Sequence, residues 1–430
     1  WLAAQAPRVR AAITAHGLTG KPGDRAILPG DAAEDWSALL VCDESASSPW
    51  RYASLGGFLP AGTYRLPDPG AGMLGWLLGQ YRFDRYRQQL DTGARVLLTT
   101  DPAGAAEALA LATATALVRD LVNTPAGDAG PAELEAAAEA LARRHGAAMN
   151  VTRGDPLAQG YPMIATVGQA ATRERHPRLI ELEWGDPAHP RVALVGKGVT
   201  FDTGGLDIKP SSSMRLMKKD MGGAAHVLAL AGLVMAAGLP VRLHVLVPAV
   251  ENAIGGAAFR PGDVLRTRQG LTVENTNTDA EGRLILGDAL TRAAEGRPEL
   301  ILDYATLTGA ARVALGPDLP PLFSNDDALA EALLAAGRAV ADPLWRMPLW
   351  DGYDELLKSD IADLVNAPDG GFAGAITAAL FLRRFVPKEI AWAHLDVFAW
   401  RPTARPGRPK GGDAYGLRAA FAMLKARYRR

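Results

Sequence analysis

Acidic and basic side chains that could bind metal ions gather in two short segments of the chain. In the first segment, Lys197 and Asp202 follow an apolar run at residues 192–195, and Lys209 and Asp220 lie a little further along. Carboxylate oxygens bind divalent cations, and a lysine joins them only as a neutral amine. Side chains of these types in one site favour hydrolysis assisted by bound metal ions.

The second segment adds two carboxylates, Asp279 and Glu281, which are two residues apart. In an extended or turning segment, residues at this spacing can face the same way. Together with Asp202 and Asp220 they would place four negative charges in one site, which two divalent ions would neutralise. Oxygen ligands suit Mg²⁺ or Mn²⁺, and Zn²⁺ also binds such sites.

The two lysines of the first segment have different predicted roles. Desolvation beside two divalent ions would lower the pKa of Lys197 enough for it to act as an amine ligand. Lys209 could stay charged and act on the reacting carbonyl. Taken singly, each residue also has an ordinary explanation, since Asp220 fits a helix cap and Lys209 an exposed loop. The presence of all these residues in two short segments favours a metal site over these separate explanations.

Several other functional classes lose support from the sequence. No histidine is followed by glutamate as in HExxH, no GxSxG motif occurs, and residues 196–198 do not form a P-loop. The 46 Lys and Arg against 47 Asp and Glu give a net charge of -1, which does not favour nucleic acid or a membrane surface. Residues 1–8 do not look like a secretory signal. The single cysteine, Cys42, favours a reducing compartment, so we predict a cytoplasmic protein.

The elements that must position these residues alternate between buried strands and helices. A helix is predicted at Pro131–His145, and residues 221–239 are predicted to form a buried helix rather than a membrane span. We expect an α/β fold in which a small N-terminal α/β domain, residues 1–155, precedes a larger catalytic domain, residues 156–430, with a mainly parallel central sheet flanked by helices. Buried strands are predicted at residues 179–182, 192–195, 241–247, 300–302 and 390–397.

The sequence closely resembles the leucyl aminopeptidase (cytosol aminopeptidase) family of dinuclear metallopeptidases. Residues 277–284, Asn-Thr-Asp-Ala-Glu-Gly-Arg-Leu, match the hallmark of that family. The resemblance covers about residues 160–430. Its other matching segments are residues 195–205, 208–210, 217–225, 305–310, 373–379 and 394–396.

The resemblance implies a metal-dependent aminopeptidase that hydrolyses the N-terminal peptide bond of peptides with a free N-terminus. Its cofactors would be two divalent ions, zinc or manganese, with magnesium also compatible. The exchangeable ion would bind Asp202, Asp279 and Glu281. The tighter ion would be held by Lys197, Asp202, Asp220 and Glu281.

The resemblance also implies a mechanism and an assembly. A metal-bridging water would attack the peptide carbonyl, Lys209 would stabilise the oxyanion, and Arg283 would hold a bicarbonate ion as proton shuttle. The position of Arg283 at a predicted helix start, where backbone N–H groups favour an anion, agrees with this role. The family's assembly implies a homohexamer. Neither a membrane nor nucleic acid is an expected partner.

One departure from the family concerns substrate preference. Phe398 and Trp400 stand where small residues are expected near the wall of the pocket for the substrate's first side chain. If Phe398 narrows that pocket, small or unbranched apolar residues such as Ala or Met are favoured over Phe. The alternative is that Phe398 points into the core. A non-enzymatic scaffold or DNA-binding protein with the same fold is the opposing class, and retention of every metal carboxylate and of Lys209 argues against it.

Overall fold

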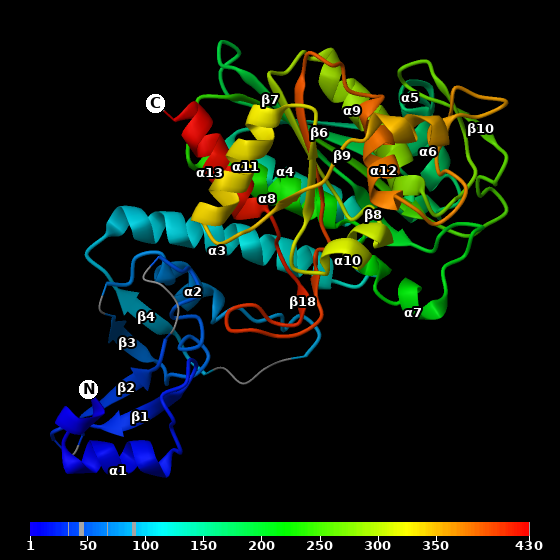
Figure 1. Ribbon diagram of the computed structural model, residues 1–430. Helices are drawn as coiled ribbons and strands as arrows, with labels where there is room; N and C mark the ends of the chain where they lie inside the picture. The colour runs from blue at the N-terminus through cyan, green and yellow to red at the C-terminus, as the bar shows by residue number, and fades with distance from the viewer. Residues whose placement is uncertain (33, 43–46, 67, 88–91, 430) are drawn as a thin grey trace. The chain divides into compact units, whose positions relative to one another are not determined.

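The computed structural model describes residues 1–32, 34–42, 47–66, 68–87 and 92–429 (Figure 1). The chain forms two compact units, one of residues 1–112 and 404–409 and the other of residues 113–403 and 410–430. The structure therefore divides the chain earlier than the boundary after residue 155 that the sequence predicts. The reason is that β5 (Ala148–Arg153) pairs along its whole length with a strand of the larger unit's sheet.

The smaller unit is built from two small sheets and short helices. β1 and β2 pair in antiparallel fashion, and β3 and β4 pair in parallel. One hydrophobic cluster joins Ile13 of α1 to Ala26 and Leu28 of β1, and a second centres on Trp76 of α2. The elements within residues 1–112 are η1 (Leu2–Ala4), α1 (Pro7–Ala15), β1 (Arg25–Pro29), β2 (Trp36–Leu40), β3 (Gly62–Arg65), α2 (Gly72–Leu78), β4 (Arg95–Leu98) and the first part of α3 (Pro102–Asn123).

The larger unit is organised around a nine-stranded mixed sheet. Its strand order is β14-β13-β16-β12-β7-β9-β6-β5, and β8 also pairs with β9. The strands at its centre, β16, β12, β7 and β9, are parallel to one another. At one side of the sheet, β6 runs antiparallel to both of its neighbours, β9 and β5. The strands of this sheet are β5, β6 (Arg178–Trp184), β7 (Arg191–Gly196), β8 (Gly198–Asp202), β9 (Arg242–Asn252), β12 (Leu300–Ala305), β13 (Pro321–Ser324), β14 (Trp345–Arg346) and β16 (Ala391–Asp396).

The predicted strands correspond to β6, β7, β9, β12 and β16, so the mainly parallel central sheet is confirmed. The apolar runs identified these strands because a strand covered on both faces is apolar on both faces. The remaining strands of the unit form two small sheets. They are β10 (Val264–Arg266), β11 (Thr272–Glu274) and β15 (Leu364–Val365) in one, and β17 (Trp400–Arg401) and β18 (Gly411–Gly412) in the other.

Helices cover both faces of the sheet (Figure 1). α8 packs on β7 and β12 and contacts α4 and α13, whereas α9 packs on β7 and β9 and contacts α6 and α12. The helices are the rest of α3, α4 (Pro131–His145), α5 (Gly154–Gly160), α6 (Pro162–Gly168), η2 (Arg173–Arg175), α7 (Ser211–Met214), η3 (Met217–Lys219), α8 (Gly222–Ala236), α9 (Glu281–Glu295), α10 (Gly309–Leu315), α11 (Asp327–Ala339), η4 (Asp351–Leu357), α12 (Gly374–Arg383) and α13 (Leu417–Tyr428).

The segment at residues 221–239 forms α8, whose residues are almost all buried. A helix that is apolar on every side belongs in the interior, and here it lies between the sheet and other helices. The prediction of a buried helix is therefore confirmed. Within the described ranges, no helix combines the length and the apolar character needed to cross a bilayer.

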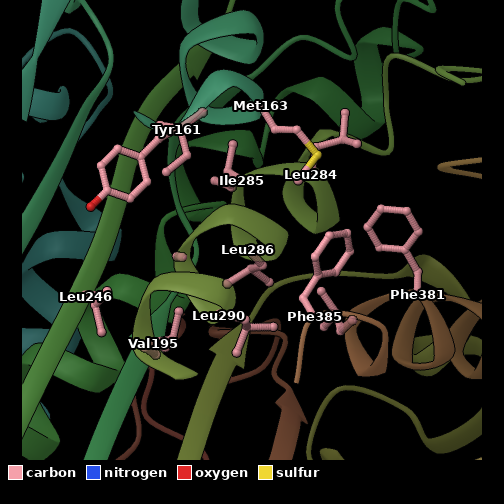
Figure 2. Packing of buried hydrophobic residues seen from close by; sticks show 14 of the residues in the cluster. Tyr161, Met163, Val195, Leu246, Leu284, Ile285, Leu286, Leu290, Phe381 and Phe385 are labelled. Carbon is pink, nitrogen blue, oxygen red and sulfur yellow. The ribbon is translucent and has the colours of Figure 1, made fainter. Parts of the chain in front are cut away.

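The core on the α9 side of the sheet holds that helix in place. Figure 2 shows Leu284, Ile285 and Leu290 of α9 in one hydrophobic cluster with Phe381 of α12 and Val195 of β7. These side chains are fully buried. The first turn of α9 carries Glu281, so packing along this helix fixes one end of the predicted site.

A buried carboxylate on α9, Asp288, ties this helix to two neighbouring segments. One of its oxygens accepts hydrogen bonds from the backbone N–H groups of Met163 at 2.8 Å and Ile164 at 3.3 Å. The other accepts from the N–H of Arg268 at 2.8 Å. Both oxygens are therefore engaged as acceptors, and the first turn of α6 is anchored to α9.

Asp288→Asn should lower the midpoint of thermal unfolding measured at pH 8. The amide nitrogen would have to face a backbone N–H group, and an unsatisfied buried donor costs about 1–3 kcal/mol. Glu331→Gln, an exposed substitution on α11, makes the same change from carboxylate to amide and should leave the midpoint unchanged. An Asp288→Asn protein that melts with the wild type would show that these hydrogen bonds do not hold the helix.

Candidate metal centre

The predicted ligands meet at the carboxyl ends of the central strands. Lys197 directly follows β7 and Asp202 is the last residue of β8. Asp220 lies just before α8, and Glu281 opens α9 with Asp279 two residues earlier. In open α/β sheets, ligands bind at this edge, so the topology accounts for the convergence of segments that lie far apart in the sequence.

Three of the carboxylates form a compact group. One oxygen from each of Asp202, Asp279 and Glu281 lies within 4.8 Å of the others, a separation that suits a shared metal ion. Asp220 joins this group through Lys197, whose Nζ lies 2.6 Å from Asp220 Oδ2 and 2.9 Å from Glu281 Oε1. The structure therefore brings all five predicted metal ligands together.

Lys209 lies on the other side of the same group. Its Nζ is 2.9 Å from Asp202 Oδ2 and 2.6 Å from Asp279 Oδ1, and its side chain lines a cavity. Burial alone would lower the pKa of Lys209, but Asp202 and Glu281 outweigh burial and raise it. The ammonium group therefore stays protonated and can donate hydrogen bonds.

Burial and mutual repulsion disturb the carboxylates. Burial, reinforced by the charge of Asp202, raises the pKa of Glu281 to about 8 and that of Asp279 to about 6. Burial also opposes ionisation of Asp220, but Lys197 outweighs it and lowers the pKa of that carboxyl. Acidic groups held this close need positive charge nearby to ionise together, as in sites built for metal ions.

Lys197 is charged in this arrangement. Burial favours its neutral form, but Asp220 and Glu281 raise its pKa. Its Nζ also donates a hydrogen bond to the carbonyl of Thr306 at 3.2 Å. Because the carboxylates hold the proton on this amine, a role for Lys197 as an amine ligand depends on cations beside it and stays a prediction.

The donor set fits divalent cations. Glu281 Oε2 is buried and accepts no hydrogen bond from any described residue. An ionised carboxylate oxygen without a partner is costly to bury, and a metal ion would satisfy it. Oxygen donors from four carboxylates with one amine suit two ions of the Mn²⁺ or Zn²⁺ type.

Two glycines leave space that the site needs. A Cβ on Gly282 would lie 2.6 Å from Lys197 Nζ, so the second residue of α9 must be glycine for Lys197 to reach Glu281. Gly204 has a φ of 87°, and a Cβ there would lie 2.9 Å from Asp279 Oδ1. Both glycines belong to the segments that resemble the aminopeptidase family.

Arg283 lies in the first turn of α9 and lines the same cavity. One guanidinium nitrogen donates to the carbonyl of Asn366 at 2.6 Å, whereas Nε is buried and has no hydrogen-bond partner among the described residues. Burial lowers the pKa of Arg283 to about 10, which leaves it charged at neutral pH. A guanidinium with a free donor at a helix N-terminus can bind an anion.

Several residues that the sequence did not predict as part of the site hold the ligands in position. Asn252 Nδ2 donates to Asp202 Oδ1 at 2.9 Å, and Thr306 Oγ1 donates to Asp220 Oδ1 at 2.8 Å. Asn252 ends β9 and Thr306 follows β12, so the rule that ligands lie past strand ends could have found both. Asn366, which positions Arg283, gave no such signal.

The segment at residues 394–396 holds neighbouring parts of the site in position through hydrogen bonds. His394 Nδ1 lies 2.5 Å from Asp303 Oδ1 and joins β16 to β12 inside the core. Asp396 accepts hydrogen bonds from the backbone N–H groups of Leu307 at 3.0 Å and Thr308 at 3.1 Å. These bonds fix the loop that forms one side of the cavity.

The cavity beside the metal ligands has a volume of about 590 Å³. Its lining includes Met217, Thr306 and Gly309. Phe398 also lines the cavity and is only partly buried, so it does not point into the core. Trp400 lies in β17, outside this lining.

The fold and the site together define a class of protein. A mainly parallel sheet presents, at the carboxyl ends of its strands, a cluster of carboxylates with lysines and arginines around an open cavity. Such an arrangement is that of a metal-dependent hydrolase with a dinuclear centre.

The chain matches the models of two domains from one known family. Residues 116–421 match the catalytic domain of the cytosol aminopeptidase family, and residues 1–99 match the M17 aminopeptidase N-terminal domain. A probable cytosol aminopeptidase of Syntrophotalea carbinolica is 43% identical over 369 residues, which are 82% of this chain and 73% of that protein. The chain belongs to the cytosol aminopeptidase family and is a metal-dependent hydrolase of the leucyl-aminopeptidase type.

Solved structures agree with this assignment. The cytosol aminopeptidase from Coxiella burnetii is 46% identical, superimposes with a TM-score of 0.95, and is matched over 100% of this chain and 94% of that one. The bottromycin maturation enzyme BotP in complex with Mn is 36% identical with a TM-score of 0.90, over 96% of this chain and 95% of that one.

Proposed function

We propose that this aminopeptidase removes the N-terminal residue of peptides with two divalent ions bound among its carboxylates. The tighter ion would be held by Lys197, Asp202, Asp220 and Glu281, and the exchangeable ion by Asp202, Asp279 and Glu281. The observation that carries the proposal is the convergence of these side chains at one sheet edge, with an unsatisfied Glu281 oxygen among them. When bound, the ions would supply a water activated for attack and a Lewis acid for the peptide carbonyl.

Lys209 is proposed to stabilise the oxyanion that forms at the substrate carbonyl. Its ammonium lies at the cavity beside Asp279 and stays charged. A fixed positive donor interacts more strongly with a developing oxyanion than with a neutral carbonyl, and this difference lowers the barrier.

Arg283 is proposed to bind a bicarbonate ion, and this ion would serve as the proton shuttle. The free Nε of Arg283 and its place in the first turn of α9 support binding of a planar anion. The Arg283 guanidinium donates a 2.6 Å hydrogen bond to the backbone carbonyl of Asn366. This bond orients Arg283 without the help of a bound anion.

Manganese or zinc is the proposed metal, with magnesium also compatible with the oxygen donors. The Mn found in the BotP complex supports manganese. The test is hydrolysis of aminoacyl-p-nitroanilides after chelation and after addition of each ion. Activity should disappear on chelation and return with Mn²⁺ or Zn²⁺. Hydrolysis that survives removal of all metal would refute the proposal.

Phe398→Ala should shift the substrate preference toward bulkier N-terminal residues. The Phe398 ring lines the cavity with Met217 and Thr306, so the wild type should favour Ala or Met over Phe at the first position. A methylene-sized change in such a pocket is worth roughly 1–3 kcal/mol, so kcat/KM for Phe relative to Ala should rise at least about tenfold. An unchanged profile in a folded, metal-loaded variant would mean that Phe398 does not limit the pocket.

We propose that the protein is cytoplasmic and that it assembles into a homohexamer. The single cysteine is compatible with a reducing compartment, and a net charge of -1 is compatible with large contacts between subunits. Light scattering at micromolar concentration should give a mass near six chains. A stable monomer would remove this part of the proposal and leave the metal centre untouched.

A further inference from the structure

The cavity contains a lysine that neither the metal centre nor the proposed mechanism uses. Lys219 is the last residue of η3, is 4% exposed and lines the cavity. Its nearest carboxylate oxygen is Asp220 Oδ1 at 3.9 Å, which is too far for a hydrogen bond. That oxygen already accepts a hydrogen bond from Thr306, and the other Asp220 oxygen lies 2.6 Å from Lys197.

Lys219 lies on the same wall as Phe398. Its Nζ is 5.2 Å from the centre of the Phe398 ring, and the guanidinium carbon of Arg312 is 5.6 Å from that centre. Arg312 is paired with Asp396 at 2.9 Å, whereas Lys219 has no such close partner among the described residues. The ammonium of Lys219 is therefore the cation of this wall that is available to a ligand.

The charges around Lys219 leave a place for an anion. The negative charge of Asp220 acts on Lys219, and the positive charges of Arg312, Lys197 and Lys209 oppose it. Within the described part of the chain, the acidic residues that line the cavity are Asp202, Asp220 and Asp279, all of which belong to the metal cluster. A buried ammonium without a close partner is costly, and a carboxylate brought by a substrate would remove that cost.

We propose that Lys219 selects peptides whose N-terminal residue is acidic, aspartate or glutamate. The inference rests on the proposed function, since it takes this cavity as the pocket for the first side chain of the substrate. Phe398 limits the size of that side chain, and Lys219 pairs with its carboxylate. The structure therefore places a positive charge on the wall that carries Phe398.

The first test compares acids with their amides, which have nearly the same shape. The kcat/KM of the wild-type, metal-loaded protein at pH 7 is measured for α-glutamyl- and glutaminyl-p-nitroanilide, and for the aspartyl and asparaginyl pair. At least one acid should exceed its amide by about tenfold or more, as expected for a hydrogen bond to a charged group. The proposal is overturned if neither acid exceeds its amide.

The second test uses three variants. Lys219→Met should bring the ratio of acid to amide close to one, and Lys219→Arg, which keeps the charge, should preserve a preference for the acid. Lys218→Met is the matched control, because Lys218 Nζ donates to the carbonyl of Asn123 at 2.5 Å and does not line the cavity. It should keep the wild-type ratio. A preference for the acid that persists in folded Lys219→Met would also overturn the proposal.

Failure of this inference can be told from failure of the proposed function. Methionyl- and alanyl-p-nitroanilide report aminopeptidase activity without any acidic side chain. Hydrolysis of these neutral substrates with no preference for acids would reject the role of Lys219 alone. Loss of all hydrolysis in the metal-loaded wild type would reject the proposed function itself.

Discussion

Glu281→Gln is expected to lose bound metal and activity together. Glu281 is 1% exposed, one of its oxygens has no hydrogen-bond partner among the described residues, and it is proposed to bind both ions. Metal stabilisation of the transition state is worth several kcal/mol. A loss of about 4 kcal/mol corresponds to a fall in kcat of about 10³-fold.

Glu295→Gln provides a matched control on the same helix. Glu295 lies at the other end of α9 and pairs with Arg268 at 2.7 Å on the surface, a contact worth at most about 1 kcal/mol. This variant should keep its metal, measured by plasma emission, and its activity. Full metal content in an inactive Glu281→Gln protein would show that Glu281 acts in the reaction rather than in holding the ions.

Lys209→Ala should lose kcat while keeping both ions. The ammonium is proposed to strengthen its interaction as the oxyanion forms, and removal of one such donor typically lowers kcat about 10²–10³-fold. Because Lys209 is not a proposed ligand, the metal content should match that of the wild type. Steady-state kinetics on one aminoacyl-p-nitroanilide and metal analysis of the same sample check both points.

Two results would contradict this role for Lys209. A variant that raised only KM would place the lysine in substrate binding. A variant that lost metal would mean that Lys209 supports the carboxylates, which its 2.9 Å and 2.6 Å contacts with Asp202 and Asp279 also allow. The Lys358→Ala protein, altered at an exposed lysine on the surface, serves as the control for handling and folding.

The sequence predicted most of the central sheet because burial on both faces leaves a continuous apolar run. The runs at residues 192–195 and 300–302 became β7 and β12 in this way. β5 was missed because its residues alternate between exposed and partly buried, and its pairing with β6 is a long-range contact. Because the sequence does not reveal that β5 belongs to the larger sheet, it places the division between domains after residue 155, whereas the structure places it after residue 112.

The types of the candidate site residues were readable from sequence, but their surroundings were not. The spacing of Asp279 and Glu281 indicates a metal site, since both carboxylates can face one way. The direction of Lys219 depends on how η3 packs against Phe398, a contact between segments far apart in the chain. Asn366 likewise reaches Arg283 through its backbone carbonyl, which no side-chain pattern reveals.

The number of metal ions in the active protein tests the central claim most directly. Metal content by plasma emission is compared with kcat on the same sample, dialysed and then titrated with Mn²⁺ or Zn²⁺. The carboxylate cluster predicts that activity rises until two ions are bound per chain and then stays constant. Full activity with one ion per chain or fewer would contradict the dinuclear centre.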